Sequence, residues 1–107
     1  MVVPRNHEAD RLLVERCLAG QAAAREQLVK QHQDRLRRSI RAGLGPDEAA
    51  KHDVVEDLAQ KVWLSLFEKD GQRLGAYDPL QGSLDTYLAS VARHQIADYW
   101  RYRHHRP

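Results

Sequence analysis

Residues 53–67 read DVVEDLAQKVWLSLF, and this stretch decides the fold. Its apolar side chains recur every three to four residues, at Val55, Leu58, Val62 and Leu66. That spacing is typical of one helix face turned toward a core. Asp53 followed three residues later by Glu56 is the capping-box pattern, which predicts that the helix begins at this point. Strand-favouring residues never alternate cleanly with polar ones along the chain, so the sequence predicts an all-α fold.

The same spacing continues before this helix. Residues 22–42 form a second expected helix, with inward positions at Leu28, His32, Leu36 and Ile40, and the Gly-Leu-Gly-Pro run at 43–46 ends it. A shorter helix is expected to start near Asn6 or Asp10 and to stop at Gly20, which suits a left-handed cap. Its predicted inward residues are Leu12, Leu13, Cys17 and Leu18.

A long loop is expected next. Residues 70–82 read DGQRLGAYDPLQG, and three glycines with a Tyr-Asp-Pro turn break the helical pattern. Loops of this length in a compact domain are often functional. Ser83 is the predicted N-cap of the last helix, which is expected to run through Leu84 and Leu88 to Ile96 and beyond. The prediction is a compact bundle of about four helices with a long loop before the last helix.

Length and composition limit the classes of protein. A chain of 107 residues is the size of one domain, so we expect a single domain over residues 1–107, with a flexible tail at 1–8 and the start of a linker at 104–107. No apolar run is long enough for a membrane span, and no secretion signal opens the chain. One cysteine, Cys17, forms no internal disulfide. We therefore expect a cytoplasmic protein that does not use a membrane.

Enzyme chemistry has little support. The six histidines lack the spacing of a metal site, and the glycines match no phosphate-binding loop. His32 lies on an apolar face and is better interpreted as a packing residue than as a ligand or base. We expect no catalytic residues, no metal and no cofactor.

Charge is unevenly placed. Residues 53–70 hold five acids and two bases, a sum of −3, and residues 93–107 hold four arginines and one aspartate, a sum of +3. On charge alone, both segments could be solvated helix faces. In the acidic helix, Trp63 and Phe67 are either core residues or part of an apolar strip that docks a basic partner helix.

The last helix joins rings to positive charge. Its rings are Tyr87, Tyr99, Trp100 and Tyr102, and its arginines are Arg93, Arg101, Arg103 and Arg106. Single-stranded nucleic acid needs both kinds of group, because rings stack on bases and cations pair with phosphates. The alternative is that Tyr99 and Trp100 close the core while the arginines keep the terminus soluble.

Three stretches carry a family resemblance: VEDLAQKVWLSLF at 55–67, GSLDTYLASVARHQIADYWRYR at 82–103 and DRLLVERCLAGQAAAREQLVKQH at 10–32. They resemble, in that order, the D-x-x-Q-E-x-[FW] helix, the F-x-x-[WY]-L-x-x-I-A-R-N-x-x-x-D-x-x-R-x-x-R helix and the D-x-x-L-V-x-x-x-x-G-D-x-x-A-x-x-x-L start of bacterial sigma factors. The group that they resemble is the extracytoplasmic-function group. The resemblance covers about residues 9 to 106.

The resemblance implies a sigma region-two domain, which docks on the clamp coiled coil of core RNA polymerase and captures the nontemplate single strand of the promoter minus-ten element. It assigns polymerase binding to Asp57, Gln60, Lys61, Trp63 and Leu64. It assigns promoter DNA binding to Tyr77, Asp78, Gln81, Gly82, Ser83, Arg93, His94, Asp98 and Arg101. The loop would pocket a flipped base while the last helix holds its neighbours. An anti-sigma factor is a further partner that the resemblance allows.

Departures from the family pattern qualify these implications. Lys61 stands where the family usually has glutamate, and His94 stands where asparagine is usual. Full members also carry a second DNA-binding domain that this chain lacks, so we expect a fragment of a two-domain factor. Two rival hypotheses stay open: a duplex DNA-binding domain that reads the major groove with its last helix, and a protein-interaction regulator that does not bind DNA.

Overall fold

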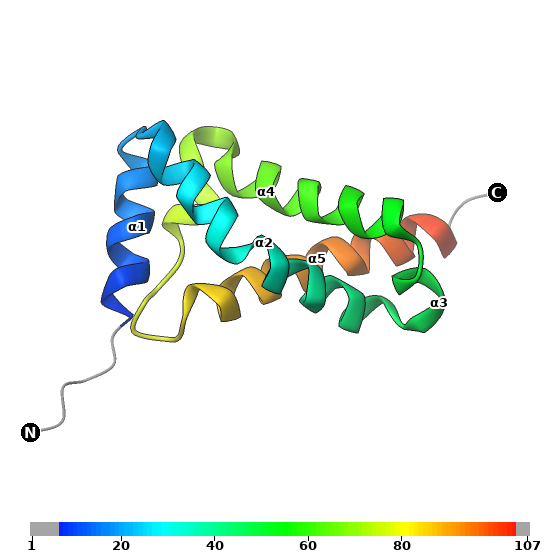
Figure 1. Cartoon of the computed structure of the whole chain (residues 1–107). Coiled ribbons are helices and arrows are strands. Elements are labelled where there is room, and N and C mark those ends of the chain that lie inside the picture. The colour runs from blue at the N-terminus through cyan, green and yellow to red at the C-terminus, as the bar shows by residue number, and fades with distance from the viewer. Residues whose placement is uncertain (1–6, 105–107) are drawn as a thin grey trace, which may run out of the picture.

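The computed structural model describes residues 7–104, and in this range the chain forms helices and no strand. The helices are α1 (Glu8–Leu18), α2 (Ala22–Leu44), α3 (Pro46–Ala49), α4 (His52–Gly75) and α5 (Leu84–His104). Helices α2, α4 and α5 run lengthwise beside one another, α1 lies across one end, and the short α3 turns the chain at the other end (Figure 1). The prediction of an all-α bundle is confirmed, with four long helices and one single turn.

Helix α2 is central, because it contacts α1, α3, α4 and α5. The periodic residues that predicted its inward face are all buried, and so are those that predicted the inward face of α4. His32 is buried with them, as the packing interpretation predicted. The core is therefore built mainly where the apolar faces of α2, α4 and α5 meet, and α1 adds Leu13, Val14 and Cys17 to it.

The predicted inward face of α1 is partly wrong. Leu13 and Cys17 are buried, but Leu12 is 46% exposed and Leu18 is 43% exposed. Helix α1 packs on α2 and α4 across only one end of the bundle, so fewer of its positions face the core. Gly20 does follow α1 in the left-handed conformation, with φ of 86°, as predicted.

The capping box predicted at the start of α4 is not formed. The helix begins at His52, one residue before the predicted cap, and its N-cap residue Lys51 makes no side-chain capping hydrogen bond. Glu56, the other half of the pattern, instead forms an ion pair with Arg37 of α2, where Arg37 Nε lies 2.8 Å from Glu56 Oε1. A tertiary charge pair has replaced the local cap.

The loop before α5 is shorter than predicted. The backbone leaves helical geometry at Glu68 and passes through three left-handed residues, Lys69, Asp70 and Gly71, before a last helical turn that ends at Gly75. The segment without helix is 76–83. The predicted start of the loop at Asp70 is wrong, because the break at 68–71 only redirects α4 and the chain stays helical from there to Gly75.

The far end of the bundle is held by Glu48. Its carboxylate accepts hydrogen bonds from Lys51 Nζ at 2.6 Å and from the Tyr99 hydroxyl. Both bonds lower the pKa of Glu48, and the bond from Lys51 has the larger effect. Tyr99 also packs edge to face on Trp100, with ring centroids 5.3 Å apart. Tyr99 thus closes the core, in agreement with the alternative interpretation of the terminal rings.

The ends of the expected domain are described only in part. Residues 1–6 of the predicted flexible tail and residues 105–107 of the predicted linker lie outside the described residues. Helix α1 already begins at Glu8, and α5 continues to His104. Both residues were assigned to those segments and instead lie in helices.

Gly71→Ala should destabilise the fold, because Gly71 has φ of 78° and an added Cβ would lie 2.8 Å from Leu18 Cδ2. We expect a loss of about 1–2 kcal/mol in the free energy of unfolding, measured by urea denaturation. Gly75→Ala is the matched control, since its Cβ would meet Leu18 Cδ1 at an ordinary 3.6 Å. An equal loss in the two variants would contradict the role given to the left-handed turn.

Candidate functional site

A pocket of about 220 Å³ opens between the 76–83 loop and the first turns of α5. Ten residues line it: Ala76, Tyr77, Asp78, Gln81, Gly82, Ser83, Thr86, Tyr87, Ser90 and Arg93. Six of these were assigned to DNA binding from the sequence. The loop and the helix that follows it therefore bring together residues up to 17 positions apart, Ala76 and Arg93, around one small hollow.

Internal hydrogen bonds shape the loop. Asp78 Oδ1 accepts from the Leu80 N–H at 2.9 Å, and the Asp78 carbonyl accepts from the Gln81 N–H at 3.1 Å. The Tyr77 hydroxyl donates to the Gly82 carbonyl at 2.8 Å. The turn leaves Leu80 81% exposed at the loop, and it leaves the Gln81 side chain at the rim of the pocket.

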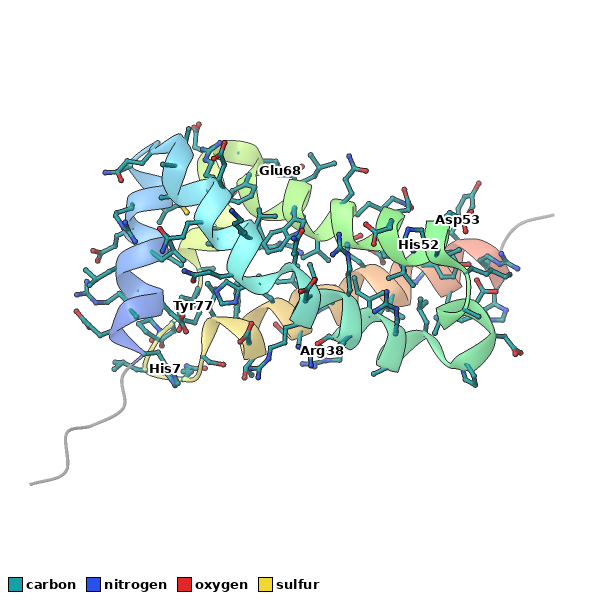
Figure 2. All side chains as sticks on the ribbon, viewed as in Figure 1. His7, Arg38, His52, Asp53, Glu68 and Tyr77 are labelled. Atoms are coloured by element: carbon teal, nitrogen blue, oxygen red, sulfur yellow. The ribbon has the colours of Figure 1, made fainter. Side chains whose placement is uncertain are left out.

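Tyr77 is the buried frame of this pocket. Its side chain is only 8% exposed, and its ring packs against the ring of Tyr87 with centroids 5.7 Å apart. Figure 2 shows Tyr77 at the end of the bundle where the loop passes α1. Burial raises the pKa of the Tyr77 hydroxyl to about 12, and the carboxylates of Asp10 and Asp78 add to this shift. The hydroxyl therefore stays protonated and keeps its bond to Gly82.

The start of α5 is fixed by three side chains. Ser83 Oγ accepts from the Thr86 N–H at 3.2 Å, which confirms the predicted N-cap. Asp10 of α1 accepts from the Leu84 N–H at 2.9 Å. Asp85 pairs with two residues of α2, at 2.7 Å from His32 Nδ1 and 3.0 Å from Arg35 Nη1. The pocket is therefore built on a helix terminus that is tied to both neighbouring helices.

The other residues assigned to DNA lie outside the pocket. His94, Asp98 and Arg101 are exposed on α5, and Arg101 forms an ion pair with Asp98 at 2.9 Å. Arg93 lines the pocket, and within residues 7–104 it takes part in no ion pair. Arg93 is therefore the cation at this site whose charge is left uncompensated.

The residues assigned to polymerase binding share the exposed side of α4. Asp57, Gln60 and Lys61 are exposed, and Leu64 is 60% exposed. Lys61 Nζ lies 3.1 Å from Asp57 Oδ2, one helical turn away. The strip thus combines an apolar side chain with an acid whose charge is partly matched by its own neighbour.

Trp63 and its neighbour Phe67 lie at the edge of this strip, and both are half-buried. Their rings stack with centroids 6.4 Å apart and an interplanar angle of 14°. The Arg25 guanidinium of α2 lies 5.3 Å from the Phe67 ring centroid. Each ring packs against the core while staying partly exposed, which agrees with the core interpretation, and the docking interpretation stays a prediction.

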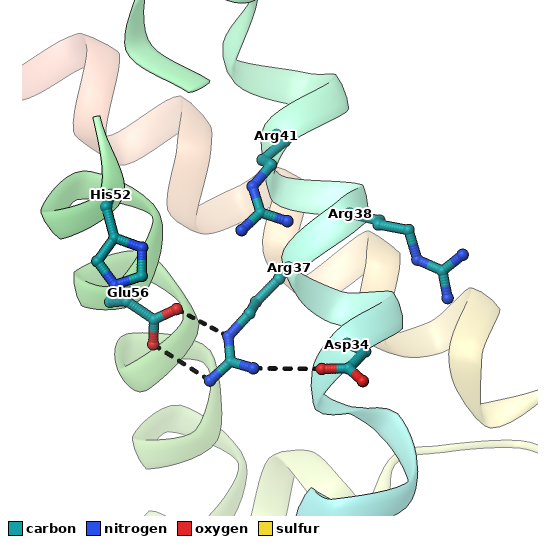
Figure 3. A pocket seen from close by; sticks show the side chains of 6 residues that line it. All are labelled: Asp34, Arg37, Arg38, Arg41, His52 and Glu56. Atoms are coloured by element: carbon teal, nitrogen blue, oxygen red, sulfur yellow. Dashed lines mark hydrogen bonds and ion pairs between the residues drawn. The ribbon is translucent and has the colours of Figure 1, made fainter. Parts of the chain in front are cut away.

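A wider hollow of about 650 Å³ lies between α2 and the first turn of α4 (Figure 3). Its lining is Asp34, Arg37, Arg38, Arg41, His52 and Glu56. Arg37 forms ion pairs with Glu56 and Asp34, whereas Arg38 and Arg41 form no ion pair within the part of the chain that the structure describes. This hollow is larger than the loop pocket, but its acids serve the fold, and it holds no residue that the sequence assigned to a site.

Two other kinds of site were searched for among residues 7–104. No three histidine, cysteine or acidic residues in this range come together in a way that could hold a metal ion. No helix in the same range combines the length and the apolar composition needed to cross a membrane.

Comparison with known families decides the class of protein. The profile described as Sigma-70 region 2 matches residues 28–106, which is 79 of the 107 residues. The chain belongs to the sigma-70 region 2 family. No curated protein and no solved structure gives a significant match. A sigma region-two domain is a non-catalytic transcription factor domain that takes part in core RNA polymerase binding and promoter melting.

Some residues of this sigma domain's pocket were missed from the sequence. Thr86 and Ser90 line the pocket but were not assigned to it, although Ser83, Thr86, Ser90 and Arg93 recur at helical spacing and so share one face of α5. Asp10 was also missed as a site residue. It lies before the matched range, and only the tertiary fold brings it to Leu84.

Tyr77→Phe should lower the free energy of unfolding by about 1 kcal/mol at pH 7, because the bond to the Gly82 carbonyl is lost. Since the folded pKa of Tyr77 is raised to about 12 from about 10 in the unfolded chain, its stabilisation is complete below pH 10. It is lost as the pH rises toward 12. We therefore expect the gap between wild type and variant to narrow from pH 7 to pH 11 in urea titrations. A gap that stays constant would contradict the burial of this hydroxyl.

Proposed function

We propose that this chain is the region-two domain of an extracytoplasmic-function sigma factor. It uses the exposed strip of α4 to bind the clamp coiled coil of core RNA polymerase. It uses the loop pocket and α5 to recognise and trap the nontemplate single strand of the melted promoter minus-ten element. The domain works in the cytoplasm and needs neither a metal nor a cofactor.

The loop pocket is the observation that carries this proposal. Trapping a melted strand requires a hollow that accepts one extruded base and groups that hydrogen-bond its edge. The pocket of about 220 Å³ is lined by Gln81, Ser83 and Thr86, and the hydroxyls of the last two lie 3.0 Å apart in a mutual hydrogen bond. An amide both donates and accepts hydrogen bonds, so Gln81 is suited to reading a base edge. Extruding the base costs a few kcal/mol of unstacking free energy, which its hydrogen bonds and stacking in the pocket would offset.

Arg93 would supply most of the phosphate affinity. It borders the pocket and has no acidic partner within residues 7–104, so its charge is available for a phosphate. Arg101 and Asp98 pair with each other at the surface, and such exposed pairs are weak enough to exchange partners. His94 lies on the same exposed side of α5 and would contact a base or phosphate beside the pocket.

The strip on α4 fits a helical protein partner. Leu64 provides the exposed apolar centre, while Asp57 and Gln60 provide a polar rim, which is the usual arrangement at a protein interface. Trp63, which is half-buried, adds aromatic surface beside it. An anti-sigma factor that covered Leu64 would compete with polymerase for this strip.

Capture of purified core RNA polymerase by the tagged chain tests the proposal. We expect wild type to retain polymerase and Asp57→Ala/Gln60→Ala to lose at least tenfold in affinity, because interface truncations of this kind cost about 1–2 kcal/mol. Glu26→Ala/Gln31→Ala removes an exposed acid and an exposed amide from α2 and is the matched control. Failure of folded wild type to bind polymerase would sink the proposal.

Lys61→Gln should strengthen capture by up to about fivefold. Lys61 occupies the Asp57 carboxylate through their 3.1 Å ion pair, and an exposed pair of this kind is worth up to about 1 kcal/mol. Removing it frees Asp57 for the partner. Arg11→Gln, which breaks ion pairs with Glu8 and Glu15 on α1, should leave capture unchanged. Weaker capture by Lys61→Gln would mean that Lys61 itself contacts polymerase.

A further inference from the structure

A second hollow adjoins the loop pocket. Its volume is about 350 Å³, and it is lined along the end of α4 by Ser65, Glu68, Lys69, Gln72 and Arg73. Ala76 and Tyr87 line this hollow and also line the loop pocket. The two hollows therefore share a wall, and a chain molecule that occupied one could continue into the other. We call the second hollow the α4 groove.

The shared wall is a fixed aromatic ring. The Tyr87 hydroxyl donates to the Arg73 carbonyl at 2.6 Å, which ties the ring to the end of α4. On its other side the ring packs against Tyr77, with an interplanar angle of 49°. Because its hydroxyl is bonded to Arg73 and its ring packs on Tyr77, Tyr87 is a rigid partition between the loop pocket and the α4 groove.

The groove offers cations without partners. Within residues 7–104, neither Lys69 nor Arg73 takes part in an ion pair. Lys69 belongs to the left-handed turn at 69–71, which interrupts α4 at the rim of the groove, and Arg73 lies in the last turn of the same helix. Figure 2 shows Glu68 at this end of α4, far from His52 at the other end. The interruption of α4 therefore places two uncompensated cations beside the partition.

We propose that the α4 groove is a second nucleotide subsite, which takes the nucleotide next to the one held in the loop pocket. This inference rests on the proposed function. The strand crosses Tyr87 with one base in the loop pocket and the next base in the α4 groove, and Lys69 and Arg73 pair with the phosphate of the second nucleotide. Rings interleaved with cations are the arrangement that single-stranded nucleic acid requires.

The other side chains of the groove favour a nucleotide over an acidic peptide. Glu68 would repel a carboxylate, but it accepts a hydrogen bond from the exocyclic amino group of a base. The Gln72 side chain can hydrogen-bond to the edge of a base or to water. The Ser65 hydroxyl already donates to the Val62 carbonyl at 2.8 Å, so it can only accept a further hydrogen bond. A base with an amino group, namely adenine, cytosine or guanine, therefore suits the groove better than thymine.

Titration of the ¹⁵N-labelled chain with deoxynucleoside 5′-monophosphates and with the sixteen 5′-phosphorylated deoxydinucleotides tests this inference. The amide signal of Gly82 reports on the loop pocket, and that of Gln72 reports on the groove. We expect at least one dinucleotide to shift both signals and to bind more tightly than any mononucleotide. Lys69→Gln/Arg73→Gln should weaken that dinucleotide about fivefold and leave mononucleotide affinity at Gly82 unchanged.

Arg16→Gln/Lys30→Gln is the matched control, because it removes the same charge from exposed positions on α1 and α2. If dinucleotides shift Gly82 alone and the groove variant behaves like this control, the second subsite is overturned while the proposed function stands. If dinucleotides shift neither signal, the subsite and the DNA-binding part of the proposed function both fail. If hexaglutamate shifts Gln72 as strongly as the best dinucleotide, the groove is a site for acidic peptides and the inference is wrong.

Discussion

The first turn of α5 is the constraint on which the functional surface depends. Its N–H groups have no partners within the helix, and Asp10 of α1 supplies one for Leu84 while Ser83 supplies one for Thr86. Asp85 then ties the same turn to His32 and Arg35 of α2. Negative groups at a helix N-terminus are also favoured by the helix dipole. These contacts fix the end of the loop that joins α5, and the loop is therefore anchored to α1 and α2.

A buried histidine belongs to this constraint. His32 lies on the core face of α2, and its Nδ1 is 2.7 Å from Asp85 Oδ1, so a position that periodicity assigns to packing also carries a polar contact. The Asp85 carboxylate accepts from Arg35 as well. One carboxylate thus links the buried and exposed sides of α2 to the beginning of α5. The loop pocket is held by polar tertiary contacts as well as by apolar packing.

Much of the fold could be predicted because apolar periodicity is a local signal. Leu28, Leu36 and Ile40 follow it and are buried. The predictions that failed concern residues whose environment depends on partners distant in the sequence. Glu56 looks like half of a capping box until Arg37 of α2 is placed beside it, and Leu18 looks like a core residue until α1 is seen to cross the end of the bundle. In the candidate site, too, some residues could be predicted from local patterns and others only from the tertiary packing.

Loop residues of the site, such as Asp78 and Gln81, could be assigned from family motifs and turn chemistry. The groove at Lys69 and Arg73 could not, because no spacing pattern predicts that three left-handed residues will interrupt α4 and return it to a helical turn. Local patterns specify helices and turns, whereas hollows arise where two such elements meet. The α4 groove exists only because Tyr87 of α5 closes it.

Helix α4 is the element that joins the two proposed surfaces. Its exposed strip at Asp57 and Leu64 lies on the helical stretch that also holds the core residues Val62 and Leu66, and the last turn, after the interruption at 68–71, forms one side of the groove. A partner that docks on the strip therefore docks on a helical stretch whose opposite face is packed into the core. The position of the partner then determines where the groove and the loop pocket stand relative to it. If the proposed function holds, binding of polymerase to the strip would orient the loop pocket and the α4 groove toward the path of the trapped strand.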